Sequence, residues 1–130
     1  MKKLYETIEK HQEEQTELFD KYDVFWAFNN EKFKAEKEKR GLENKDLYRW
    51  LAGSFVPKKN ADKLFDEYDK LLDRQAKELK NYGDDYIRYE LANHETTHTH
   101  DLTDALEILR AVGFEQEEVL KVYNEMLESE

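Results

Sequence analysis

Two long stretches of the chain repeat their apolar residues at the spacing of an α-helix. The first covers residues 3–21 and places on one face Leu4, Ile8, His11, Gln15, Leu18 and Phe19. The second runs from Asn60 to Tyr82 for about six turns, with a stripe made of Ala61, Leu64, Phe65, Tyr68, Leu71, Leu72, Ala76 and Leu79. Asn60 is suited to cap this second helix and Gly83 to end it. We therefore expect one thin amphipathic helix and one long central helix.

Between these two stretches the pattern changes from helical to strand-like. The run Val24–Phe28 is short, aromatic and β-branched, which is typical of a buried strand. Residues 46–57 (DLYRWLAGSFVP) supply more strand material around a turn at Gly53–Ser54, and Pro57 marks a strand end. We expect an antiparallel sheet of two or three strands, with Trp26 and Phe28 buried beside Leu47–Leu51.

Two shorter helices are indicated by their end signals. Residues 31–40 (EKFKAEKEKR) form the first, with Asn30 as a cap and Gly41 as a stop. The second begins at Asp84 and Asp85, because two carboxylates suit the positive end of a helix dipole.

The C-terminal region reads as a helical hairpin. Residues 102–114 (LTDALEILRAVGF) and 115–129 (EQEEVLKVYNEMLES) are both helical in spacing, Thr103 is a cap, and Gly113 makes the turn. The residues expected to face the interior are Ala105, Leu106, Leu109, Val119, Leu120, Tyr123 and Met126. The whole pattern predicts an α+β fold that is predominantly helical, in one domain over residues 1–130.

The amino-acid composition indicates a folded rather than a disordered protein. Charged residues make up 40% of the 130 residues and aromatic residues 13%; disordered acidic tails lack aromatics, so this chain has a core. There is no cysteine, which fits a reducing cytoplasm. The N-terminus lacks the apolar run of a signal peptide, and no stretch approaches the ~20 apolar residues of a membrane helix. We expect a soluble protein that contacts no membrane.

The net charge of −10 is unevenly distributed. Residues 1–82 hold 18 acidic and 18 basic residues, whereas residues 83–130 hold 13 acidic and 3 basic ones. Such asymmetry bears on partners and association rates rather than on the fold. The acidic end is either a solubilising surface or a face that imitates nucleic-acid phosphates and docks on a basic groove. The candidate residues of this acidic face are Glu107, Glu115, Glu117, Glu118 and Glu125.

The segment Asn93–Asp101 (NHETTHTHD) gathers three of the four histidines. In a continuing helix, His94 and His98 share a face and can reach the same ion. Imidazole nitrogens with a carboxylate suit tetrahedral Zn²⁺, or less selectively Ni²⁺ and Co²⁺. The segment therefore predicts one divalent ion, zinc first, held by His94, His98 and His100, with Asp101 or Glu95 completing the shell.

The same segment is equally typical of a polar helix end. Thr96, Thr97 and Thr99 are poor helix formers, and Asp101 or Thr103 can cap the helix that follows. Histidine near a helix C-terminus is also favoured by the dipole. Both interpretations stay open. If an ion binds, a structural or partner-bridging role is favoured over catalysis, because the sequence offers no nucleophile triad or phosphate-binding loop beside it.

Three blocks of the chain form recognisable patterns: an F-x-A-F-x-x-E-x-F segment at Phe25–Phe33, a V-P-K-K-N segment at Val56–Asn60, and a Y-E-x-x-N-H-E … T-x-D pattern at Tyr89–Glu95 and Thr99–Asp101. In these blocks the chain resembles a family of small uncharacterised proteins carried by phages and prophages of Firmicutes. His100 departs from that pattern, in which glycine is commoner. The resemblance implies a mobile-element accessory protein in the cytoplasm of a bacterial host, and no particular chemistry.

Small size, acidic asymmetry and this resemblance lead to a first hypothesis that is not an enzyme. The protein would inhibit a host defence nuclease, an anti-CRISPR role with a Cas9-type target, by binding protein through its acidic face without touching nucleic acid itself. Two alternatives stay open. One is a small metal-dependent hydrolase with Glu95 as the base beside a histidine-bound ion. The other is a phage structural or assembly component that binds another phage protein.

Overall fold

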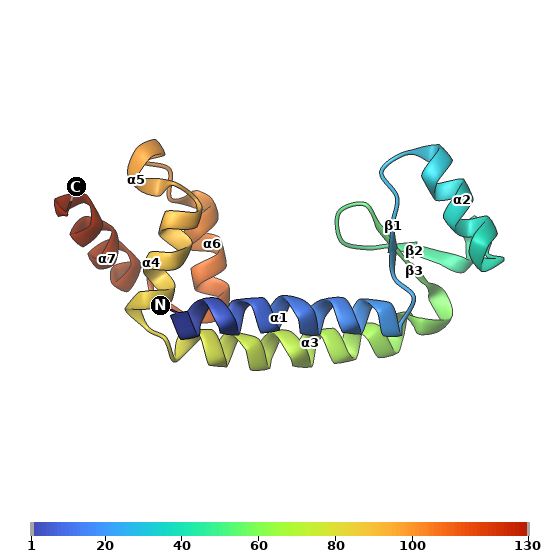
Figure 1. Cartoon of the computed structure of the whole chain (residues 1–130), viewed down its shortest axis with the longest axis horizontal. Coiled ribbons are helices and arrows are strands. Elements are labelled where there is room, and N and C mark those ends of the chain that lie inside the picture. Colours follow the sequence, from blue (N-terminus) through green and yellow to red (C-terminus); the bar gives the residue numbers. More distant parts are fainter. Residues whose placement is uncertain (1, 130) are drawn as a thin grey trace. The chain divides into compact units, whose positions relative to one another are not determined.

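The computed structural model describes residues 2–129, which contain seven α-helices, a short 3-10 helix and three β-strands (Figure 1). In chain order these are α1 (Lys2–Lys21), β1 (Phe25–Trp26), α2 (Asn30–Arg40), η1 (Asn44–Asp46), β2 (Leu47–Arg49), β3 (Ser54–Pro57), α3 (Lys58–Lys80), α4 (Asp84–Asn93), α5 (Thr96–Thr99), α6 (Thr103–Val112) and α7 (Gln116–Glu128). The predicted α+β fold is confirmed, including the long central helix, the C-terminal hairpin and the small antiparallel sheet.

The chain divides into two compact units. We call residues 10–71 the sheet unit and residues 1–9 with 72–130 the helical unit. The boundary falls inside both α1 and α3. The single domain over residues 1–130 stays a prediction. Within residues 2–129, no helix combines the length and apolar character needed to cross a membrane.

Strand β3 lies in the middle of the three-stranded sheet of the sheet unit. Strands β2 and β3 form a local hairpin, closed by a hydrogen bond of 3.0 Å from Trp50 N to Ser54 O. Because β2 occupies one edge of β3, β1 pairs with the other edge, in the register Phe25↔Phe55 and Trp26↔Ser54. The expectation that the aromatic strand lies beside Leu47–Leu51 is therefore wrong.

The two aromatic residues expected to be buried lie on the surface. Trp26 is 36% exposed and Phe28 is 80% exposed. The strand is only two residues long, and Phe28 lies beyond its end with its ring against Gly53 of the β2–β3 turn, where φ is +73°. The residues of this run that are buried instead are Val24, Phe25 and Ala27.

The interior of the sheet unit is small and rich in rings. Val56 and Leu64 are fully buried, packed with Tyr22, Val24 and Ala61. Around them, the Phe19 ring lies 5.5 Å from the rings of Trp26 and Trp50 and 5.6 Å from that of Tyr68. Aromatic contacts at this distance contribute beyond the area that they bury.

Helix α2 is attached to this unit by few side chains. Its N-cap is Asn29, whose side chain accepts a hydrogen bond of 2.8 Å from Lys32 N–H, so the predicted cap at Asn30 is wrong by one residue. The predicted stop at Gly41 is confirmed, with φ +66°. No residue of α2 is fully buried, and its Phe33 ring packs 4.4 Å from that of Phe55.

Helix α3 begins two residues before its predicted cap. Asn60 lies inside the first turn, and its Nδ2 donates to the carbonyl oxygen of Tyr22 over 2.8 Å. Pro57 directly precedes the helix, at a place where a missing N–H costs little. The helix ends at Lys80, and Gly83 is the N-cap of α4.

The helical unit has a closed interior that is mainly aliphatic and also contains the buried rings of Tyr86, Phe114 and Tyr123. Side chains from α1, α4, α6 and α7 meet there, with at most 1% exposure for Leu4, Ile87, Leu91, Leu109, Val119 and Val122. The predicted hairpin is confirmed: Gly113 ends α6 with φ +114°, and Phe114 is buried against it. Lys80 donates from Nζ to the carbonyl oxygen of Gly113 and lies 4.3 Å above the Phe114 ring. The burial of Ala105 and Tyr123 also follows the prediction.

Candidate functional site

Helix α4 ends where the histidine segment begins. His94 is its C-cap, and Glu95 then adopts a left-handed conformation with φ +52°. This conformation costs a non-glycine residue about 1–2 kcal/mol. The buried hydroxyl of Thr96 offsets part of that cost by donating to the carbonyl oxygen of Leu91 over 2.9 Å, since late carbonyls of a helix lack internal partners. The continuing helix that would place His94 and His98 on one face is therefore wrong.

His94 faces a partner inside the helical unit. Its Nε2 lies 3.5 Å from Oε2 of Glu90, an ion-pair distance when the imidazole is protonated. On the other side of this carboxylate, the Tyr86 hydroxyl donates to Glu90 Oε1 over 2.9 Å. Glu90 is only 7% exposed, and the hydrogen bond from Tyr86 offsets part of the desolvation of its carboxylate. Burial raises the pKa of the Tyr86 hydroxyl well above its ordinary value, and the nearby Glu90 charge adds to that effect.

The remaining predicted ligands have separate surroundings. His100 Nδ1 lies 3.0 Å from the Tyr123 hydroxyl, while His98 and Glu95 are exposed. Asp101 Oδ1 accepts a hydrogen bond of 3.0 Å from the backbone N–H of Thr103. That bond, with a second one from the Thr103 side chain, holds the pKa of Asp101 below its ordinary value. The N-cap of α6 is Leu102, so the predictions of Asp101 or Thr103 as the cap are wrong; Asp101 instead satisfies the N–H of Thr103, the first residue of the helix.

Zinc binding at this segment stays a prediction. Within residues 2–129, no three His, Asp or Glu side chains are grouped so that they could hold a metal ion. A zinc ion bound by the predicted set would have to draw together side chains whose present contacts are with Glu90, Tyr123 and Thr103.

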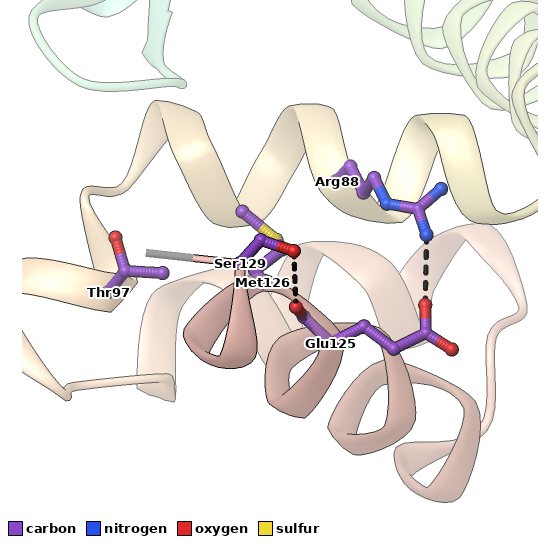
Figure 2. A pocket seen from close by; sticks show the side chains of 5 residues that line it. All are labelled: Arg88, Thr97, Glu125, Met126 and Ser129. Carbon is purple, nitrogen blue, oxygen red and sulfur yellow. Dashed lines mark hydrogen bonds and ion pairs between the residues drawn. The ribbon is translucent and has the colours of Figure 1, made fainter.

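A pocket of about 320 Å³ opens in the helical unit beside α4, α5 and α7. Its lining is made of Arg88, Thr97, Glu125, Met126 and Ser129 (Figure 2). Arg88 donates to Glu125 Oε2 over 2.9 Å, and Asp85 lies 3.9 Å from the same guanidinium. The volume is at the lower limit of small-molecule pockets. An anion that entered it would have to compete with two carboxylates for Arg88.

The five residues of the predicted acidic face differ in their contacts. Glu115 and Glu118 form a capping box at the start of α7, in which the Glu118 carboxylate accepts from Glu115 N–H over 3.2 Å. Glu125 is engaged by Arg88. Glu107 on α6 and Glu117 on α7 are exposed. Three of the five therefore make contacts within the helical unit itself, although two of these three, Glu115 and Glu118, are exposed to solvent as Glu107 and Glu117 are.

One comparison with known proteins covers almost the entire chain. A family model described as a family of unknown function (DUF7659) matches residues 6–129. The chain belongs to this family. No curated protein matches it, and no solved structure does either.

In this member of DUF7659, sequence reasoning missed two groups of residues. The first is the contact of Tyr86 and Glu90 with each other and with the predicted ligand His94; their four-residue spacing was a usable signal, because it places Tyr86, Glu90 and the C-cap His94 on one side of α4. The second is the pairing of Arg88 with Glu125. These residues are 37 positions apart, so no local pattern connects them.

Proposed function

We propose that this DUF7659 member acts by binding a partner protein through the exposed acidic surface of α6 and α7. The observation that carries the proposal is the charge distribution: 13 acidic and 3 basic residues lie in residues 83–130, against 18 of each in residues 1–82. The exposed acidic residues of the two helices are Asp104, Glu107, Glu117, Glu118 and Glu128. We call these five residues the acidic surface.

The fold of the helical unit does not need most of these charges. Its interior is closed by aliphatic side chains, and exposed carboxylates contribute little to stability. Ile108, directly after Glu107, is 38% exposed and supplies an apolar contact point within the acidic surface. Interfaces commonly combine such an apolar centre with a charged rim.

A basic groove that normally holds nucleic acid is the kind of partner surface that fits. Complementary charge raises the association rate and gives specificity, and both effects weaken in salt. A CRISPR nuclease of the Cas9 type is the first target to test, on the strength of the sequence resemblance to phage and prophage proteins. Inhibition would follow from occupying the groove in place of nucleic acid.

The test compares two variants with the same change in net charge. One reverses Glu107, Glu117 and Glu128 to Lys, and leaves the capping box and the Arg88 ion pair intact. The matched control reverses Glu13, Glu17 and Asp69, which are exposed in the sheet unit. Surface changes of this kind usually alter stability by less than about 0.5 kcal/mol each, so binding can be measured separately.

Binding to immobilised Cas9 is measured at low and at high salt, together with DNA cleavage. We expect the first variant to bind at least about tenfold more weakly, a loss of about 1.4 kcal/mol, and the control to bind like the native protein. Equal weakening in both variants would show that only net charge matters. If the native protein neither binds Cas9 at low salt nor reduces cleavage, Cas9 is not the target.

A further inference from the structure

A second pocket, of about 150 Å³, lies in the sheet unit where β3 passes into α3. Its lining is made of Leu42, Lys45, Asp46, Pro57, Lys58 and Lys59. Three of these six residues carry an ammonium group and one carries a carboxylate, so the formal charge of the lining is positive. This pocket is independent of the acidic surface, which belongs to the helical unit.

The one carboxylate in the lining, that of Asp46, already accepts a hydrogen bond within the protein. Asp46 Oδ2 accepts a hydrogen bond of 3.0 Å from the backbone N–H of Glu43, as part of the capping box of η1. Lys45 lies 3.4 Å from Glu43, but both side chains are more than 70% exposed, and such a pair is weak. Neither carboxylate therefore removes the lysine charge from the pocket.

The backbone brings the three lysines to one place, and Lys58 also contacts a ring. Lys58 Nζ lies 5.1 Å from the centre of the Tyr48 ring, and attraction between a cation and a ring fixes its direction. Pro57 pairs in register with Leu47, which brings η1 and the start of α3 to the same place. Lys58 and Lys59 open the 23-residue α3, whose first turn adds partial positive charge beside the three ammonium groups.

The size of the pocket limits what can enter it. Small-molecule sites usually occupy about 300–1,000 Å³, and one water takes about 30 Å³. A space of about 150 Å³ therefore holds a small ion with a few waters and excludes a whole nucleotide. A tetrahedral dianion can accept hydrogen bonds from several lysines at once, and such charge-assisted bonds are the strong ones.

We infer that this pocket binds a phosphate group through Lys45, Lys58 and Lys59. The phosphate is either the free ion or the end of a small phosphorylated molecule whose remaining part stays outside the pocket. Both sources share one chemistry, because the same oxygens contact the same lysines. The Tyr48 ring, 47% exposed beside Lys58, is available to contact the remainder of a larger ligand.

The test is an NMR titration of the ¹⁵N-labelled full chain with inorganic phosphate, then with AMP, at constant ionic strength. We expect saturable shifts centred on the amides of residues 58–61 and 45–46. A variant with Lys45→Gln, Lys58→Gln and Lys59→Gln should bind at least tenfold more weakly. The matched control, with Lys32→Gln, Lys34→Gln and Lys39→Gln, loses the same charge from exposed positions of α2 and should bind like the native chain.

The two titrations distinguish free phosphate from a phosphorylated molecule as the ligand. Tighter binding of AMP, with added shifts at Tyr48, would identify a phosphorylated molecule, whereas equal binding would identify the free ion; either result supports the inference. Linear, unsaturated shifts with phosphate would overturn it. Equal weakening in the pocket variant and the control would overturn it as well, by showing non-specific attraction of anions. Chemical shifts of residues outside the pocket verify that each variant is folded.

Discussion

The helical unit and the sheet unit fill their interiors in different ways. The helical unit packs Leu, Ile and Val side chains that are almost completely hidden, together with three rings that are at most 9% exposed, and it also buries Glu90, which Tyr86 and His94 approach from two sides. The sheet unit has fewer fully buried residues and relies on rings that stay partly exposed. Aliphatic packing excludes water, so it stabilises strongly and makes any buried charge costly.

In the sheet unit, Lys and Arg side chains pack over aromatic rings where aliphatic side chains could otherwise lie. The guanidinium of Arg40 lies 4.3 Å from the centre of the Phe25 ring, and Lys37 Nζ lies 4.6 Å from that of Phe33. Arg40 also donates to Asp23 and Glu36, and these hydrogen bonds raise the pKa of Arg40 against the opposing effect of its partial burial. A helix can thus be attached through contacts that stay accessible to water, although each such contact stabilises the fold less than a fully buried one would.

The largest effect on stability is expected from truncating one large packed side chain in each unit to alanine. Leu91→Ala in the helical unit should lower the free energy of unfolding by about 2–5 kcal/mol, because Leu91 is fully buried and a cavity remains. Phe33→Ala in the sheet unit removes a larger but half-exposed side chain and should cost about 1–2 kcal/mol. Urea unfolding of both variants measures the difference. Equal losses would contradict the contrast between the units.

A smaller effect is expected from the buried polar contact in the helical unit. Tyr86→Phe removes a donor to Glu90 and should cost about 1–3 kcal/mol at neutral pH. Tyr48→Phe, which removes an exposed hydroxyl in the sheet unit, is the control and should change little.

The loss in Tyr86→Phe should also depend on pH. Because the folded-state pKa of Tyr86 lies above the ordinary value of 10, its protonated hydroxyl contributes stability fully below pH 10 and loses that contribution as the pH rises further. One proton changes the unfolding free energy by at most about 1.4 kcal/mol per pH unit. The native protein should therefore lose stability above pH 10 more steeply than Tyr86→Phe, in urea titrations at pH 8, 10 and 11. Parallel curves would show that Tyr86 titrates normally.

The smallest effect concerns zinc at the histidine segment. A bound ion would add to stability, but it would first have to bring together His94, His98, His100 and Asp101, which now have separate surroundings, and this rearrangement offsets part of the gain. We therefore expect zinc to raise the melting temperature by only a few degrees, and a chelator to reverse this. A His94→Ala, His98→Ala variant should not respond. Identical melting of metal-free native protein with and without zinc would leave the segment as a capped polar turn.

Local patterns predicted those elements whose signals are local. The stripe in residues 61–79 lies within α3, and Gly41 and Gly113 end α2 and α6 as expected, because a left-handed residue at a helix end is a property of that residue. The partner of β1 was predicted wrongly, because pairing depends on which edge of β3 is still open after the β2–β3 hairpin forms. Trp26 was expected inside because it is apolar, but a strand of two residues has little interior to offer.

The residue types of the candidate site could be predicted from the sequence, but their arrangement in space could not. The histidines and carboxylates were visible in the sequence, but their grouping depended on a helix continuing through Glu95. The left-handed turn at that residue separates His94 from His98. The use of Glu115, Glu118 and Glu125 inside the helical unit was hidden for a similar reason, since a charge count does not distinguish a capping carboxylate from a free one.

The order β1-β3-β2 has a consequence for the behaviour of the chain at high concentration. Only β3 is paired on both sides, so the open edges of the sheet belong to strands of two and three residues. An edge that short offers few unpaired N–H and C=O groups, and β2 also carries Arg49 and lies beside Lys58. Short, charged edges make poor templates for strands of another molecule. The sheet of this protein should therefore resist edge-to-edge aggregation even though each edge strand carries an exposed aromatic residue, Trp26 on β1 and Tyr48 on β2.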